Sequence, residues 1–142
     1  RVRAAGGKPV WLVGTSNGTL AAAAAAIALG GAIDGLVLTS SVTDPLLPQS
    51  VQKLALDRIA VPVLVVHHKL DECPGTPPAG AELIVEGLTH ASARKLLLVE
   101  GGGPAWGPRC EPMHWHGYIG MEQEVVDAIA AFVRGHTHAA SR

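Results

Sequence analysis

Short apolar runs alternate along the chain with segments that have the composition of helices. Four runs have the length and continuity of buried strands, and they cover residues 9–14, 35–39, 61–67 and 94–99. Helices are expected between them at 18–29 and 79–88, with a shorter helical piece around 51–56. This alternation predicts an α/β fold in which a parallel sheet is flanked by helices.

The last predicted helix has the clearest helical period. Its apolar side chains share one stripe, formed by Ile119, Val126, Ile129 and Phe132. Gly135 follows as the expected C-cap. We therefore expect a single domain over residues 1–135 and a flexible C-terminal tail over residues 136–142.

The composition excludes several classes of function. The 142 residues carry 11 Lys and Arg against 12 Asp and Glu, a formal net charge of −1, and 48% of them are hydrophobic. Disorder requires low hydrophobicity and nucleic-acid binding requires a basic surplus, so neither is expected. The most apolar stretch, residues 20–30, is too short to span a bilayer. The expected partner is a small molecule, and the oligomeric state stays open.

A first indication of chemistry is the run Gly-Thr-Ser-Asn-Gly at residues 14–18, which matches the pattern G-x-S-x-G. It stands where a strand ends and a helix of small residues begins, a turn that holds its central Ser16 in a strained, exposed conformation. We expect Gly14 and Gly18 to be required because a Cβ at either position would collide with the neighbouring strand or helix. The alternative is an ordinary connection in which Ser16 is the helix N-cap.

From about residue 8 to residue 135 the sequence resembles the α/β-hydrolase superfamily in its serine esterase-like form. The order Ser16, Asp71, His116 is the order of nucleophile, acid and base in that family. The resemblance implies that the four strands correspond to the family's strands five to eight. The chain would then be the C-terminal half of the domain, and Arg1, in place of an initiator Met, marks the expected cut.

This resemblance implies a serine hydrolase that cleaves a carboxylic ester, or a related acyl bond, through an acyl-enzyme. Ser16 would attack the carbonyl carbon, His116 would take and return the proton, and Asp71 would orient the imidazole. The N–H of Asn17 would be one donor of the oxyanion hole. In the family the second donor comes from a loop after the third strand, so the isolated 142 residues are expected to be inactive.

Alternatives remain for the acid and the base. Asp44 follows the second strand, where some members of the family carry the acid, and Glu72 adjoins Asp71. Asp71 is also a residue type that caps loops. His114 is a rival to His116, whose spacing to the final helix favours it as the base.

The two cysteines lie in the loops that carry the proposed acid and base. Cys73 follows Asp71 by two residues, and Cys110 precedes His116 by six. We hypothesise a Cys73–Cys110 disulfide that keeps the Asp-His pair in register, with two unrelated thiols as the alternative. A disulfide would imply a periplasmic or secreted location, whereas free thiols would leave a cytoplasmic one open.

A metal site is a competing interpretation of the same edge of the sheet. Residue types that zinc accepts gather there, namely His67, His68, Asp71, Cys73, Cys110, His114 and His116. They lack C-x-x-C and H-E-x-x-H spacings, so we expect neither a metal nor a cofactor. His67 and His68 stand at a strand end, where we expect them to line the pocket or to pack beneath it.

The fold alone leaves other functions open. The connection over residues 40–60 is too short for a lid domain, which favours small or accessible esters. An acyltransferase would use the same scaffold with an acceptor other than water. A truncated, non-catalytic hydrolase-like module is the contrasting class.

Overall fold

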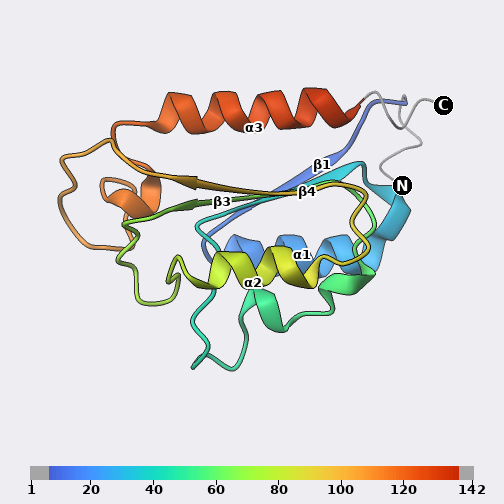
Figure 1. Ribbon diagram of the computed structural model, residues 1–142, viewed down its shortest axis with the longest axis horizontal. Helices are drawn as coiled ribbons and strands as arrows, with labels where there is room; N and C mark the ends of the chain where they lie inside the picture. Colours follow the sequence, from blue (N-terminus) through green and yellow to red (C-terminus); the bar gives the residue numbers. More distant parts are fainter. Residues whose placement is uncertain (1–6, 138–142) are drawn as a thin grey trace.

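The computed structural model describes residues 7–137, which form one parallel sheet with helices on both faces (Figure 1). Its strands are β1 (Trp11–Thr15), β2 (Gly35–Thr39), β3 (Val63–His68) and β4 (Arg94–Val99). They lie side by side in chain order, and each neighbouring pair is parallel. The predicted α/β class and its four strands are confirmed.

Three helices enclose the sheet. Figure 1 shows α1 (Gly18–Leu29) and α2 (Gly80–Gly87) below it and α3 (Glu122–Thr137) above it. The buried side chains of α1 are small, among them Ala22, Ala23 and Ala26, so its backbone lies close to β1 and β2. None of the helices described here is long and apolar enough to cross a membrane.

Burial explains why the strands are recognisable as apolar runs. Every residue of β2 and β3 is buried because helices cover both faces of these central strands. In contrast, β1 pairs only with β2 among the described residues, and its Val13 side chain is 59% exposed. The sheet thus has a well-covered centre and an open edge at β1.

The final helix departs from the predicted stripe. It begins at Glu122, so Ile119 precedes it, and its buried residues are Val125 and Phe132, whereas Val126 is 57% exposed. The placement of Val126 in the core is therefore wrong, because the helix presents Val125 to the sheet instead. Val125 belongs to the same apolar cluster as Val37 and Leu64 of the sheet, with Phe132 two turns further along the helix.

Two other predicted boundaries also change. The helix α3 continues through Gly135 to Thr137, so Gly135 is not its C-cap. Most of the predicted tail, residues 138–142, lies outside the described residues. The helical piece expected around 51–56 is two separate 3₁₀ turns, Val51–Lys53 and Leu56–Arg58.

The carboxyl ends of the strands share one edge of the sheet, and the loops leaving this edge carry the candidate residues. Ser16 follows β1, Asp71 follows β3 and His116 lies in the connection after β4. Ligands of open α/β sheets bind outside the carboxyl ends of the strands, so this edge is where a site is expected.

Candidate active site

Ser16 occupies a tight turn between β1 and α1. Its φ of +53° lies in the left-handed region, which is unfavourable for a residue with a Cβ. The backbone is held there by bonds from Ser16 N to Thr39 O (3.0 Å) and from Thr19 N to Ser16 O (2.9 Å). The N-cap of α1 is Asn17, and the Ser16 side chain makes no hydrogen bond to another described residue. The N-cap interpretation of Ser16 is therefore wrong.

The two glycines that flank Ser16 have different roles. A Cβ on Gly14 would come within 2.6 Å of the Gly18 carbonyl oxygen and 2.7 Å of Ala22 Cβ, so this position requires glycine. A Cβ on Gly18 would meet nothing within 4 Å. The steric argument is thus correct for Gly14 and wrong for Gly18, whose carbonyl group is the neighbour that Gly14 must avoid.

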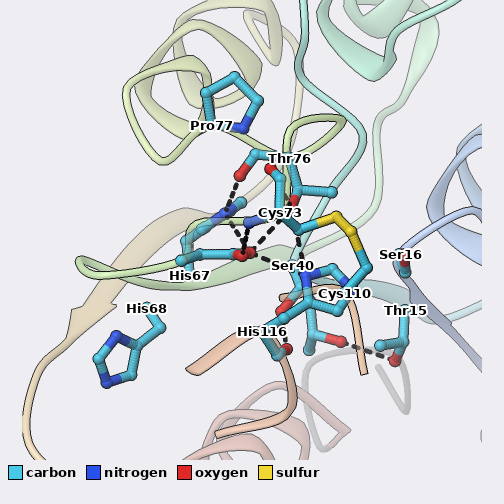
Figure 2. Close-up of polar contacts among 12 residues, drawn as sticks. Thr15, Ser16, Ser40, His67, His68, Cys73, Thr76, Pro77, Cys110 and His116 are labelled. Atoms are coloured by element: carbon cyan, nitrogen blue, oxygen red, sulfur yellow. Dashed lines mark hydrogen bonds and ion pairs between the residues drawn. A yellow bond between two sulfur atoms is a disulfide. The ribbon is translucent and has the colours of Figure 1, made fainter. Parts of the chain in front are cut away.

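Asp71 lies just beyond β3 and is 6% exposed. Its Oδ2 accepts hydrogen bonds from His116 Nδ1 and from Thr76 Oγ1, both at 2.9 Å. Its Oδ1 accepts one from Cys73 N at 3.0 Å, and His67 Nε2 lies 3.3 Å from Oδ2 (Figure 2). The carboxylate is thus surrounded by donors from its own loop, from β3 and from the loop after β4.

These donors control the charge of Asp71. Burial by itself raises the pKa of its carboxyl group, but the hydrogen bonds from His116, His67 and the Cys73 N–H, with the charge of His116, outweigh burial. The pKa therefore lies well below its ordinary value of 3.8. Asp71 is ionised at neutral pH and acts as an acceptor only.

His116 is held by its backbone as well as by its ring. It lies in the 3₁₀ turn Trp115–Gly117, and its carbonyl oxygen accepts from Ser40 Oγ at 2.7 Å. Tyr118, two residues after His116, donates its O–H to Val66 O and accepts a hydrogen bond from Ser40 N, both at 3.0 Å. Burial raises the pKa of Tyr118 to about 12, so the phenol stays protonated and remains a donor. The loop that carries His116 is thereby tied to β2 and β3 near their carboxyl ends.

A pocket of about 450 Å³ lies beside the Asp71–His116 pair. Ser16 and His116 both line it, and its apolar walls come from β1 and α3, namely Val13, Val125, Val126 and Ile129. The side chains of Ser16 and His116 share this pocket without a hydrogen bond between them in the described part of the chain. Catalytic hydrogen bonds are often long in unliganded proteins and shorten when substrate binds.

The rival residues lie elsewhere. Asp44 caps its own loop by accepting from Leu46 N at 2.9 Å. Glu72 points outward, 3.6 Å from Arg109 Nε and 3.8 Å from His114 Nε2. Within residues 7–137, neither Asp44 nor Glu72 makes a hydrogen bond or ion pair with His116, so Asp71 is the one of the three candidate acids that pairs with it.

His67 and His68 are both fully buried, and neither lines the pocket. Packing beneath the site is therefore the correct expectation for His67, whose Nε2 lies 3.3 Å from Asp71 Oδ2. Figure 2 shows the His68 ring pointing away from His116, and its Nε2 bonds to Gly101 O at 3.1 Å. No group of three or more His, Cys, Asp or Glu among the described residues is arranged to hold a metal ion.

The structure joins Cys73 and Cys110 in a disulfide, which confirms the predicted pairing (Figure 2). Cys73 donates its N–H to Asp71, and Cys110 lines the pocket with Ser16 and His116. The bond therefore links the backbone that holds the carboxylate to the wall of the pocket.

Replacing both cysteines with serine is expected to lower the free energy of unfolding by about 3 to 4 kcal/mol, measured by urea denaturation. The reason is that the disulfide closes a loop between residues 37 positions apart, which restricts the unfolded chain. Reduction of the wild-type protein should have the same effect, and a reducing agent should leave the double variant unchanged. Two free thiols in protein made under oxidising conditions would contradict the pairing.

Several contacts of the site were not predicted from sequence. Thr76 bonds to Asp71 and Ser40 bonds to the His116 carbonyl, whereas Tyr118 bonds to Ser40. The contacts of Ser40 join residues 76 and 78 positions apart, so no local sequence pattern indicates them. The one local signal was the Gly-Tyr pair after His116, whose Tyr118 has a left-handed φ of +63°.

The structure is similar to solved structures of α/β hydrolases. The Paleococcus ferrophilus monoacylglycerol lipase matches with a TM-score of 0.65 and 18% identity over 92% of this chain and 70% of the lipase. The esterase domain of a Rhodothermus marinus protein matches at 0.61 and 16%, over 96% of this chain and 64% of that one. A putative α/β hydrolase from Agrobacterium tumefaciens matches at 0.59 and 14%, over 92% and 54%.

These similarities establish the fold. The chain has the α/β-hydrolase fold, in the form of a four-stranded part of it, and it spans 54% to 70% of the three chains above. The resemblance noted in the sequence is confirmed at this level. The sequence matches no protein-family model, and no curated protein matches it.

Proposed function

We propose that the chain carries the catalytic residues of a serine hydrolase that cleaves a carboxylic ester through an acyl-enzyme. The observation that supports this most strongly is the buried 2.9 Å hydrogen bond between Asp71 and His116 beside a pocket that Ser16 lines. With Nδ1–H bound to the carboxylate, the His116 ring leaves Nε2 unprotonated and able to accept a proton.

The reaction proceeds in two acyl transfers. Ser16 Oγ bonds to the carbonyl carbon of the ester while His116 Nε2 takes the hydroxyl proton, and the same proton passes to the alcohol oxygen as the C–O bond breaks. Water then attacks the acyl-enzyme, with Nε2 taking a proton from the water and returning it to Ser16 Oγ. Asp71 stabilises the imidazolium that forms in each step.

The oxyanion is bound in part by the N–H of Asn17. Asn17 N has no hydrogen-bond acceptor among the described residues, which leaves it available at the N-terminus of α1.

The ester-cleaving neighbours and the apolar walls at Val13 and Ile129 favour an ester with an uncharged acyl group. An acyltransferase with the same residues, or a non-catalytic module, is the alternative. The disulfide favours a periplasmic or secreted location.

A fluorophosphonate probe tests the proposal directly. We expect a chain that contains these residues together with a complete oxyanion hole to react with the probe and to carry the adduct on Ser16, located by peptide mass spectrometry. With a chromogenic ester it should give a burst equal to the concentration of active sites. The isolated 142-residue chain should react much more slowly, because among its described residues the N–H of Asn17 is the single oxyanion donor that we propose.

The alternatives give different results. An acyltransferase would show the same burst but would divert product to an added alcohol or amine. A non-catalytic module would form no adduct in any chain, and an adduct on another residue would reject Ser16 as the nucleophile. Labelling of the isolated chain at the rate of an active esterase would contradict the requirement for a second donor.

A further inference from the structure

We infer that His67 is a positioning residue for the proposed reaction, holding the Asp71 loop in the conformation that orients His116. The inference rests on the proposed function and extends it to a buried histidine that takes no proton in the reaction. His67 is the next-to-last residue of β3, and its exposed fraction is 0%. It is therefore fixed in the sheet beneath the loop that carries the carboxylate.

The contacts of His67 determine its tautomer. Its Nε2 lies 2.9 Å from the carbonyl oxygen of Thr76 and 3.3 Å from Asp71 Oδ2 (Figure 2). A carbonyl oxygen and an ionised carboxylate both only accept hydrogen bonds, so Nε2 carries the hydrogen. One N–H is thus shared between two acceptors, with the shorter bond to Thr76.

The other ring nitrogen makes no hydrogen bond. Nδ1 of His67 is buried without a hydrogen-bond partner among the described residues. The polar contacts of the ring are therefore those of Nε2, whose N–H faces Thr76 O and Asp71 Oδ2.

The two acceptors of His67 belong to opposite ends of one short loop, residues 71–76. Within this loop Thr76 Oγ1 donates to Asp71 Oδ2 at 2.9 Å and lies 3.2 Å from His116 Nδ1. By binding the backbone of Thr76 and the carboxylate together, His67 sets the distance between the two groups that face the imidazole. Loss of this N–H would let the loop relax and misalign the Asp71–His116 bond.

A purely structural role would not require histidine at this position. The neighbouring side chains of β3, Val65 and Val66, are apolar and equally buried, and an apolar residue carries no unpaired nitrogen. The adjacent His68 provides the comparison, because its ring bonds to Gly101 O and Leu70 N and not to Asp71.

The test compares variants at position 67 in an active chain that contains these residues. His67→Leu removes the N–H, and we expect kcat to fall about tenfold with KM near the wild-type value. His67→Gln places an amide N–H at similar reach and should restore most of kcat. His67→Asn is one methylene shorter, cannot reach Thr76 O, and should behave like His67→Leu. His68→Leu is the matched control, with kcat near wild type.

Proton NMR separates positioning from stability. The low-field resonance of His116 Nδ1–H should shift in His67→Leu and His67→Asn and return towards its position in His67→Gln. A structural role would reduce the folded fraction without moving this resonance. If His67→Leu does not fold, the Gln and Asn pair still decides the question, since equal kcat values in these two variants would overturn the inference.

The outcomes also distinguish this inference from the proposed function. Wild-type kcat and an unshifted resonance in the position 67 variants, together with an inactive Ser16→Ala variant, would reject the role of His67 alone. Full activity of Ser16→Ala would instead reject the proposed hydrolase mechanism.

Discussion

Replacing Ser16 with alanine, in an active chain that contains these residues, is expected to abolish the burst and to lower kcat by a factor of about 10⁵ to 10⁶. The change removes the oxygen that forms the acyl-enzyme and leaves the Asp71–His116 pair without a proton to accept. It should leave stability almost unchanged, because the Ser16 side chain makes no hydrogen bond to another described residue. Steady-state and stopped-flow hydrolysis of a chromogenic ester measure the effect.

The matched control for this variant is Ser92→Ala. Ser92 is an exposed serine just before β4, at the opposite edge of the sheet, and the same loss of a hydroxyl there should not affect kcat. Ser16→Gly should be equally inactive but more stable than Ser16→Ala by about 1 kcal/mol, because glycine adopts the left-handed φ of +53° without strain. A Ser16→Ala variant that still formed an acyl-enzyme would contradict the proposal that Ser16 is the nucleophile.

Replacing Asp71 with asparagine is expected to lower kcat by a factor of about 10⁴ while the protein still folds. The carboxylate is surrounded by donors, with Cys73 N–H at Oδ1 and His116 and Thr76 at Oδ2. Either orientation of an amide therefore places its NH₂ group against a donor. If the NH₂ faces Nδ1 of His116, the ring must carry its proton on Nε2, which is then unable to accept one from Ser16.

The pH dependence of stability gives an independent measure of the same carboxylate. Because the folded protein holds the pKa of Asp71 well below 3.8, its ionised form stabilises the folded state at neutral pH. This contribution is fully present above the unfolded pKa and is lost as the pH falls from about 4 towards the folded pKa. The difference in unfolding free energy between wild type and Asp71→Asn should narrow over that interval.

Two further variants test the rival acids. Asp44→Asn and Glu72→Gln should both retain wild-type kcat, since Asp44 caps its own loop and Glu72 faces Arg109 at the surface. A loss of activity in Asp44→Asn, with Asp71→Asn unaffected, would transfer the acid role to the loop after β2.

The strands could be predicted because burial imposes a simple pattern on them. Residues 35–39 and 94–99 are strands as predicted, and helix α1 covers 18–29 as predicted. The predictions are wrong where tertiary contacts determine which of several locally equivalent residues is buried. In α3 both Val125 and Val126 fit a helical stripe, and only the docking of the helix decides that Val125 is buried.

The residues of the candidate site could be proposed from the sequence, but the neighbouring residues that hold them in place could not. Ser16, Asp71 and His116 follow strand ends, so the topology of a parallel sheet brings them to one edge. Thr76 and His67 contact Asp71 through loop conformations that depend on the whole fold. Residue spacing cannot show which donors hydrogen-bond to the Asp71 carboxylate, because those donors come from three different segments.

The hydrogen bonds of Tyr118 have a consequence for folding. Its hydroxyl joins Ser40 and Val66, which lie 78 and 52 positions away in the chain, and the His116 carbonyl is bound across 76 positions. We expect such distant contacts to form after the strands that hold their partners have paired, because the entropy of closing long loops must first be offset. A partly folded chain would then lack the Asp71–His116 hydrogen bond, which needs β3 and the loop after β4 in their final places.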